Sequence, residues 1–278
     1  MVIELFAAAQ CLVAEGPRWC AAENALYWVD ITSGVVLRKK AGTPPDVFET
    51  FDPKLGKIGA FTFVADGKLL LFTERCEVYE TTFGGRPELK WTLPGHGDTR
   101  FNDVFDAGDG VCFCGVAPIR PARRGELWRL DVRTGTFDCI EPATDGMPNG
   151  MGLSPDRRTF YFVVSDEHRV YAYDFDSATG RVSGKRVLCE DFPGDGAPDG
   201  MCVDPVDGSL YIALWGGFRL EHRAADGRLL ESIPFKIEKV SSATMAGNGI
   251  FVTTANLPFN QAAFAEQKAG CVFLIRRD

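Results

Sequence analysis

Four oxygen-bearing side chains occupy the same position in separate copies of a repeated sequence pattern. Each is followed by a short apolar segment, a tight turn and a second β-rich segment. If the four meet in space, two carboxylates and two amides lie together, and buried carboxylates without a partner cost several kcal/mol. We therefore predict that a divalent cation neutralises them. The four residues are Glu15, Asn102, Asn149 and Asp199.

The pattern recurs in six copies, whose leading positions are 43, 44, 47, 50 and 42 residues apart. A period of about 40–50 residues built from short strands and turns is typical of a β-propeller, in which each repeat is one four-stranded blade. The clearest copy has its hairpin turn at Asp207-Gly208, because Asp-Gly between alternating apolar residues favours a tight turn. The leading positions are Glu15, Ile58, Asn102, Asn149, Asp199 and Ser241.

The predicted fold is all-β: one six-bladed β-propeller domain over residues 1–278, with four-stranded antiparallel blades around a central metal-binding channel. The first strand of every blade lines this channel, and all of these strands run in the same direction. The leading residues should therefore meet at one mouth of the channel. We also expect the strand at 2–5 to pair with the strand at 270–275, because a propeller must hide its terminal edges.

Composition argues against several classes of partner. The net charge of −8 disfavours binding to nucleic acids or anionic membranes, which need a basic surface. No apolar run approaches the roughly 18 residues of a membrane helix, and residues 1–10 lack the basic start of a signal peptide. The nine cysteines show no Cys-x-x-Cys spacing and are expected in the core. We expect a cytoplasmic monomer or weak homo-oligomer.

Five motifs, in chain order, resemble the senescence-marker-protein (regucalcin) / gluconolactonase / luciferin-regenerating-enzyme family. The resemblance covers about residues 10–275. Each motif is weak alone, but five in order at propeller spacing are specific. They are Glu15-Gly16-Pro17, Arg100-x-Asn102-Asp103, Pro148-Asn149-Gly150, Ser165-Asp166 followed by Tyr173-Asp174-Phe175-Asp176, and Pro198-Asp199-Gly200-Met201.

The resemblance implies a metal-dependent hydrolase that opens sugar lactones, such as gluconolactone or pentonolactones, to aldonic acids. By motif, Glu15, Asn149 and Asp199 match the metal ligands of the family. Arg100 and Asn102 match its substrate-orienting pair. The small-molecule partner is accordingly a sugar lactone.

The chain departs from the family pattern in the loop after the third blade. Some family members carry an acidic residue there that touches the sugar, and Arg120 occupies that place in this sequence. We expect Arg120 to contact the substrate. Together with Arg123 and Arg124, it forms either a solvated basic loop or a site that selects a lactone bearing a carboxylate or phosphate.

Lactone hydrolysis needs a Lewis acid at the carbonyl oxygen and a deprotonated water, and a bound metal supplies both. Asp199, as a ligand beside that water, is the candidate general base. An all-oxygen donor set favours Ca²⁺, Mg²⁺ or Mn²⁺, and it also admits Zn²⁺ or Fe²⁺.

Two other functions stay open at this point. The same cation could serve a phosphotriesterase or another esterase. Alternatively, the propeller could bind metal or dock a protein without catalysis, which predicts a large exposed apolar patch and no chelator-sensitive turnover. The residues also have structural alternatives: Asn149 and Asp199 as turn residues, Glu15 as a solvated loop acid, and Arg100 as a partner of Asp103 or Asp98.

Overall fold

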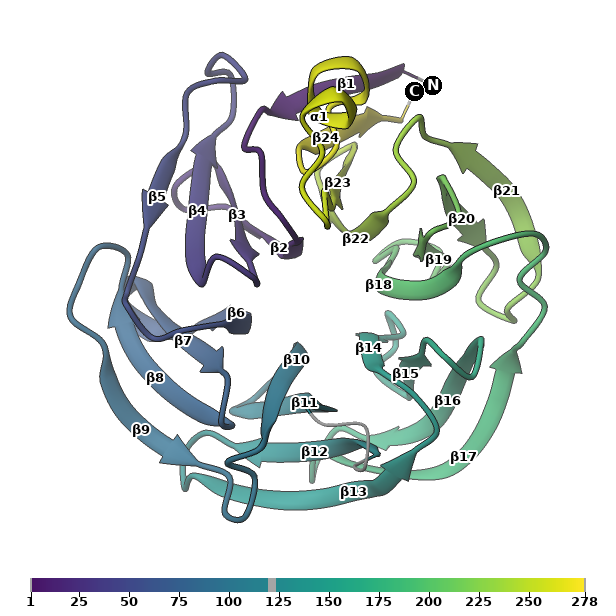
Figure 1. Ribbon diagram of the computed structural model, residues 1–278. Coiled ribbons are helices and arrows are strands. Elements are labelled where there is room, and N and C mark those ends of the chain that lie inside the picture. The colour runs from purple at the N-terminus through teal and green to yellow at the C-terminus, as the bar shows by residue number, and fades with distance from the viewer. Residues whose placement is uncertain (1, 120–123, 278) are drawn as a thin grey trace.

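The computed structural model describes residues 2–119 and 124–277. Within them, six four-stranded antiparallel sheets surround a central channel (Figure 1). The predicted six-bladed propeller is therefore confirmed. We number the blades by the chain order of their innermost strands.

The strands of the blades follow one another along the chain, apart from the first strand, which joins the last blade. Blade 1 holds β2 (Ala14–Cys20), β3 (Ala25–Asp30), β4 (Val35–Lys40) and β5 (Glu49–Phe51); blade 2 holds β6 (Ile58–Phe63), β7 (Lys68–Thr73), β8 (Glu77–Thr82) and β9 (Glu88–Thr92), with the 3-10 turn η1 (Ala65–Gly67); blade 3 holds β10 (Thr99–Gly108), β11 (Val111–Pro118), β12 (Gly125–Asp131) and β13 (Thr136–Thr144). Blade 4 holds β14 (Pro148–Leu153), β15 (Thr159–Val164), β16 (Arg169–Asp176) and β17 (Arg181–Cys189); blade 5 holds β18 (Ala197–Val203), β19 (Leu210–Trp215), β20 (Arg219–Arg223) and β21 (Leu229–Pro234); blade 6 holds β22 (Val240–Ala246), β23 (Gly249–Thr254), β24 (Val272–Arg276) and β1 (Val2–Ala7), with helix α1 (Gln261–Gln267) before β24.

The second strand of each blade is buried along nearly its whole length, because neighbouring blades pack on both of its faces. β3 is buried at every residue, as is β23. Such strands read as continuous apolar runs rather than as alternating ones. The outermost strands face solvent, and β9, for example, has no fully buried residue.

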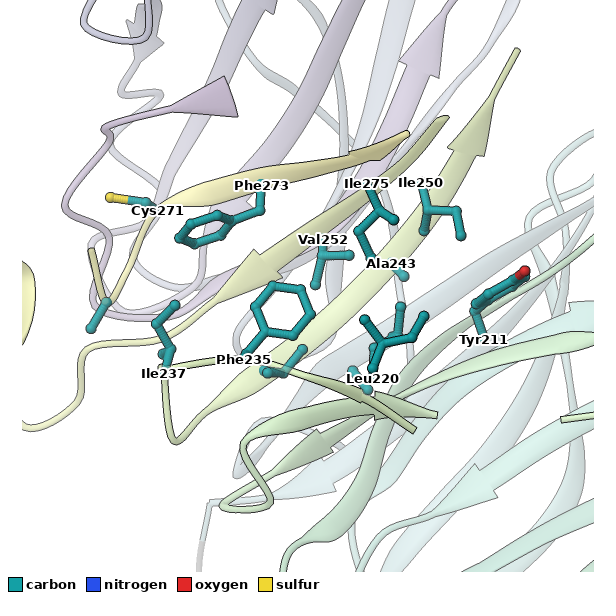
Figure 2. Packing of buried hydrophobic residues seen from close by; sticks show 14 residues of the cluster. Tyr211, Leu220, Phe235, Ile237, Ala243, Ile250, Val252, Cys271, Phe273 and Ile275 are labelled. Atoms are coloured by element: carbon teal, nitrogen blue, oxygen red, sulfur yellow. The ribbon is translucent and has the colours of Figure 1, made fainter. Parts of the chain in front are cut away.

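Packing between blades supplies the core. Between blades 5 and 6, Tyr211 and Leu220 lie against Val252, Ile275 and other buried residues (Figure 2). Blades 4 and 5 pack in the same way around a separate cluster of buried apolar residues. Each blade is therefore stabilised by apolar contact with its neighbours, at about 25 cal/mol for each Å² of apolar surface removed from water.

The ring closes through β1, which pairs antiparallel with β24, as predicted. The two ends of the chain thus share blade 6 (Figure 1). This pairing covers the edge of β24 that would otherwise present unpaired backbone groups. Within residues 2–119 and 124–277, no helix has the length and apolar character needed to cross a bilayer.

All six innermost strands have an irregularity in pairing at the repeat's leading position. Such bulges bend a strand and redirect its side chains. The register shifts fall between Glu15 and Arg18, Ile58 and Ala60, Phe101 and Val104, Pro148 and Met151, Pro198 and Met201, and Val240 and Ser242.

The closing strand pair permits a matched test of core burial. Ile3 and Ile275 are cross-strand partners, but Ile3 is 37% exposed whereas Ile275 is fully buried. We expect Ile275→Ala to lower the free energy of unfolding by about 2–5 kcal/mol, and Ile3→Ala to lower it by less than about 1 kcal/mol. Urea denaturation measures both values. Equal losses in the two variants would contradict a strand pair in which Ile275 faces the core and Ile3 faces solvent.

Candidate functional site

A cavity of about 380 Å³ opens at the channel mouth where the innermost strands begin. Its wall brings together residues from β2, β10, β14 and β18 that lie far apart in the sequence. Arg120 lies outside the described residues. The other residues expected at the site all line this cavity: Glu15, Arg100, Asn102, Asn149 and Asp199.

These side chains are withdrawn from solvent although they line a cavity. Glu15, Asn102 and Asn149 are each 7% exposed, and Asp199 is 5% exposed. Solvated turn or loop residues would not be buried to this extent. The reading of Asn149, Asp199 and Glu15 as mere turn or loop residues is therefore not favoured.

Glycines allow the innermost strands to approach closely enough to gather the site. A Cβ at Gly150 would lie 2.6 Å from the carbonyl oxygen of Asp199. At Gly200, a Cβ would lie 2.1 Å from the Ser242 hydroxyl oxygen. No side chain fits at these distances, so the glycine that follows Asn149, like the one that follows Asp199, is required by the contact with the next strand.

Asn102 and Asn149 form a hydrogen-bonded chain across two blades. Asn102 Nδ2 donates to the carbonyl oxygen of Pro148 at 2.8 Å and to Asn149 Oδ1 at 3.1 Å. Asn149 Nδ2 donates to Ser165 Oγ at 3.0 Å. Because both N–H groups of Asn102 are engaged, this residue presents an acceptor oxygen to other partners and also fixes the orientation of Asn149.

The two carboxylates are poorly compensated by the protein. Burial, followed by repulsion from Asp103, raises the pKa of Glu15 to about 8; the backbone N–H of Gly16 and the charge of Arg100 act in the opposite direction. Burial also raises the pKa of Asp199 well above its usual value, and repulsion from Glu15 and Asp103 adds to it. In the absence of a cation, the site therefore favours protonated carboxyl groups.

Arg100 is a cation whose charge acts on both carboxylates, Glu15 and Asp199. Its Nη1 donates to the carbonyl oxygen of Phe101 at 3.1 Å. Burial lowers the pKa of Arg100, whereas the charges of Glu15, Cys76 and Asp199 raise it. No salt bridge joins Arg100 to a carboxylate of the described residues, so its other N–H groups can serve a ligand.

Most of the other residues that line the cavity carry no motif in the sequence. Ser165 and Asp166 do belong to one of the five motifs, and Asp166 Oδ2 accepts a hydrogen bond from the Met147 N–H at 2.7 Å. The apolar members give no signal in the sequence, because strands rich in such residues occur throughout the chain. The further lining residues are Val13, Ile31, Thr32, Lys57, Met147, Ser165, Asp166, Ala197, Trp215 and Leu257.

Two of the six leading positions contribute no ligand. Ile58 is fully buried in the core. Ser241 Oγ donates to the carbonyl oxygen of Ala14 at 2.6 Å and so joins blade 6 to blade 1. The donors are thus confined to blades 1, 3, 4 and 5.

The donor set suits a hard divalent cation. Two carboxylates and amide oxygens are the ligands that such ions accept, and a dication would relieve the repulsion that raises the pKa values of Glu15 and Asp199. Within residues 2–119 and 124–277, no group of three or more His, Cys, Asp or Glu side chains is placed to hold a metal. The amide oxygen of Asn149 would therefore have to be a third ligand beside the carboxylates of Glu15 and Asp199.

The sequence is similar to that of a known family of proteins. Residues 13–256 match the family model described as the SMP-30/Gluconolactonase/LRE-like region. The pentonolactonase XacC of Haloferax volcanii is 37% identical over 88% of this chain and 82% of its own length. The L-arabinolactonase of Azospirillum brasilense is 30% identical over 94% of this chain and 87% of its own length.

Solved structures share the fold at lower identity. The luciferin-regenerating enzyme superposes with a TM-score of 0.88 at 23% identity, over 99% of this chain and 95% of its own. The calcium-binding protein regucalcin from Agrobacterium tumefaciens gives a TM-score of 0.88 at 19% identity, over 99% of this chain and 93% of its own. These two likenesses show the fold. The match of residues 13–256 to the family model, together with the two lactonase relatives, shows that the chain belongs to the SMP-30/gluconolactonase/LRE-like family.

Proposed function

We propose that this chain is a metal-dependent lactonase that opens sugar lactones, pentonolactones among them, to aldonic acids. The convergence of Glu15, Asn149 and Asp199 on one buried cavity wall supports the proposal most strongly. The substrate class rests on the two relatives named as a pentonolactonase and an L-arabinolactonase.

Glu15, Asn149 and Asp199 would hold the cation, which we propose to be Ca²⁺, Mg²⁺, Mn²⁺, Zn²⁺ or Fe²⁺. When bound, such an ion supplies Lewis acidity at the lactone carbonyl and lowers the pKa of water. Asn102 keeps the Asn149 amide in position through its hydrogen bond of 3.1 Å. Loss of a supporting contact of this kind typically weakens a metal site.

The protein itself would move the proton. As water attacks the carbonyl carbon, the Asp199 carboxylate accepts its proton, and it returns this proton to the ring oxygen when the C–O bond of the lactone breaks. Arg100, with N–H groups directed to no carboxylate of the described residues, would orient the substrate's oxygens. The products are the aldonate and a proton released to solvent.

Activity measurements test this function directly. We expect Asp199→Asn to lower kcat/KM for pentonolactones by about 10²–10⁴-fold, because general-base catalysis contributes a factor of this size. Chelation should abolish turnover, and a divalent cation should restore it. Asp207→Asn is the matched control, since Asp207 lies in the exposed turn of the same hairpin and its bond to the Ser209 N–H uses an oxygen that Asn retains.

Acid release from a panel of aldonolactones and phosphotriesters is the appropriate assay. Full activity after chelation would rule out the metal mechanism. Faster turnover of phosphotriesters than of lactones would replace the proposed substrate class with the esterase alternative, and no turnover of either would favour a binding role.

The raised pKa of Glu15 also predicts how stability depends on pH. Its pKa is about 8 in the folded chain, against a usual value of 4.5, so between these values the folded chain binds more protons than the unfolded chain. The stability of chelator-treated protein should therefore fall as pH rises from about 5 to about 8. A divalent cation should remove most of this loss, because it compensates the ionised carboxylates.

Thermal unfolding between pH 5 and pH 9, with and without the cation, measures this dependence. Glu15→Gln should flatten the slope in metal-free protein. A midpoint temperature that rises over the same range in the wild type, or a slope unchanged in Glu15→Gln, would contradict the electrostatic account of the site.

A further inference from the structure

Lys57 is the residue that blade 2 contributes to the wall of the site cavity. It directly precedes β6, whose first residue, Ile58, is fully buried. Blade 2 therefore brings no oxygen ligand to the channel mouth. It places an exposed lysine there instead.

The Lys57 ammonium has no hydrogen-bond or ion-pair partner among residues 2–119 and 124–277. Other cations near it in the chain or near the mouth are already paired. Lys54 lies 2.5 Å from Asp52, and Arg124 lies 2.7 Å from Asp145. Lys57 is thus available to an anion that enters the cavity.

The charge balance of the cavity favours such an anion. This step rests on the proposed function, because a bound dication would neutralise Glu15 and Asp199. Arg100 and Lys57 then contribute two positive charges to the cavity wall. Asp166, which also lines the cavity, offsets one of them. In a partly buried site, an excess charge attracts an opposite charge more strongly than it would in water.

The opposite wall has a different character. Trp215, at the end of β19 in blade 5, and Leu257, after β23 in blade 6, both line the cavity. Blade 5 lies across the channel from blade 2 (Figure 1). A ligand that spans the cavity would therefore meet the Lys57 ammonium on one side and Trp215 and Leu257 on the other. The Lys239 ammonium lies 5.8 Å from the centre of the Trp215 ring, but it is already engaged by the Leu257 carbonyl oxygen at 2.9 Å and lies 3.7 Å from Glu238.

We propose that Lys57 selects sugar lactones that carry a second acidic group, a carboxylate remote from the lactone carbonyl, as in monolactones of aldaric acids. The carboxylate binds the Lys57 ammonium, and the C–H surface of the sugar faces Trp215 and Leu257. The reacting carbonyl lies at the wall formed by Glu15 and Asp199.

The test compares Lys57→Gln with wild type on two lactones of the same ring size, one an aldaric acid monolactone and the other a neutral aldonolactone. We expect kcat/KM for the charged lactone to fall about tenfold, mainly through KM, and that for the neutral lactone to change less than about twofold. The difference should shrink at high salt. Lys57→Arg should retain the preference, and Lys54→Gln is the control outside the cavity.

A binding measurement separates this proposal from the proposed function. If wild-type protein opens neither lactone, the lactonase proposal fails, and the affinity for the aldarate dianion, measured by calorimetry, still tests Lys57. Weakening of about tenfold in Lys57→Gln supports the proposal. It is overturned if aldarate affinity is unchanged, or if the variant loses equal activity on both lactones or none on either.

Discussion

The structure depends on two like-charged side chains being held together out of water at the hub of the ring. Glu15 and Asp199 come from blades 1 and 5, and each is almost fully buried. Burial raises the pKa of both groups, and repulsion from Asp103 adds to this rise; for Asp199, repulsion from Glu15 adds further. A protein does not gain stability from such a pair alone. The arrangement is understandable if the cost is offset by a ligand, and a divalent cation bound by both carboxylates would offset it.

The propeller is well suited to assembling such a pair. Every innermost strand begins at the same end of the channel and carries an irregularity at the same position. Close strand contacts, which only glycine permits at Gly150 and Gly200, bring adjacent blades together. The apolar packing between blades (Figure 2) stabilises this geometry. The packed ring therefore stabilises a site whose buried carboxylates cost free energy, which is common at functional sites.

Much of this could be predicted from sequence, because a repeat fixes equivalent positions without knowledge of tertiary contacts. The spacing of Glu15, Asn149 and Asp199 was sufficient to place them at one mouth. The orientation of the Asn102 amide was not predictable, since it depends on a carbonyl group of the neighbouring blade. Lys57 and Trp215 likewise occupy positions with no distinctive motif, and only the curvature of the ring brings them to the same cavity. Arg120, for which a substrate contact was expected, lies outside the described residues.

We propose that Glu15 and Asp199 at the hub together bind one divalent cation. Native mass spectrometry of the intact chain, after exchange into dilute divalent metal, measures how many ions each chain holds. We expect one tightly held ion per chain in the wild type and none in the Glu15→Gln, Asp199→Asn double variant. A wild-type chain without a bound ion, or a double variant that keeps one, would show that Glu15 and Asp199 are not the ligands of a cation.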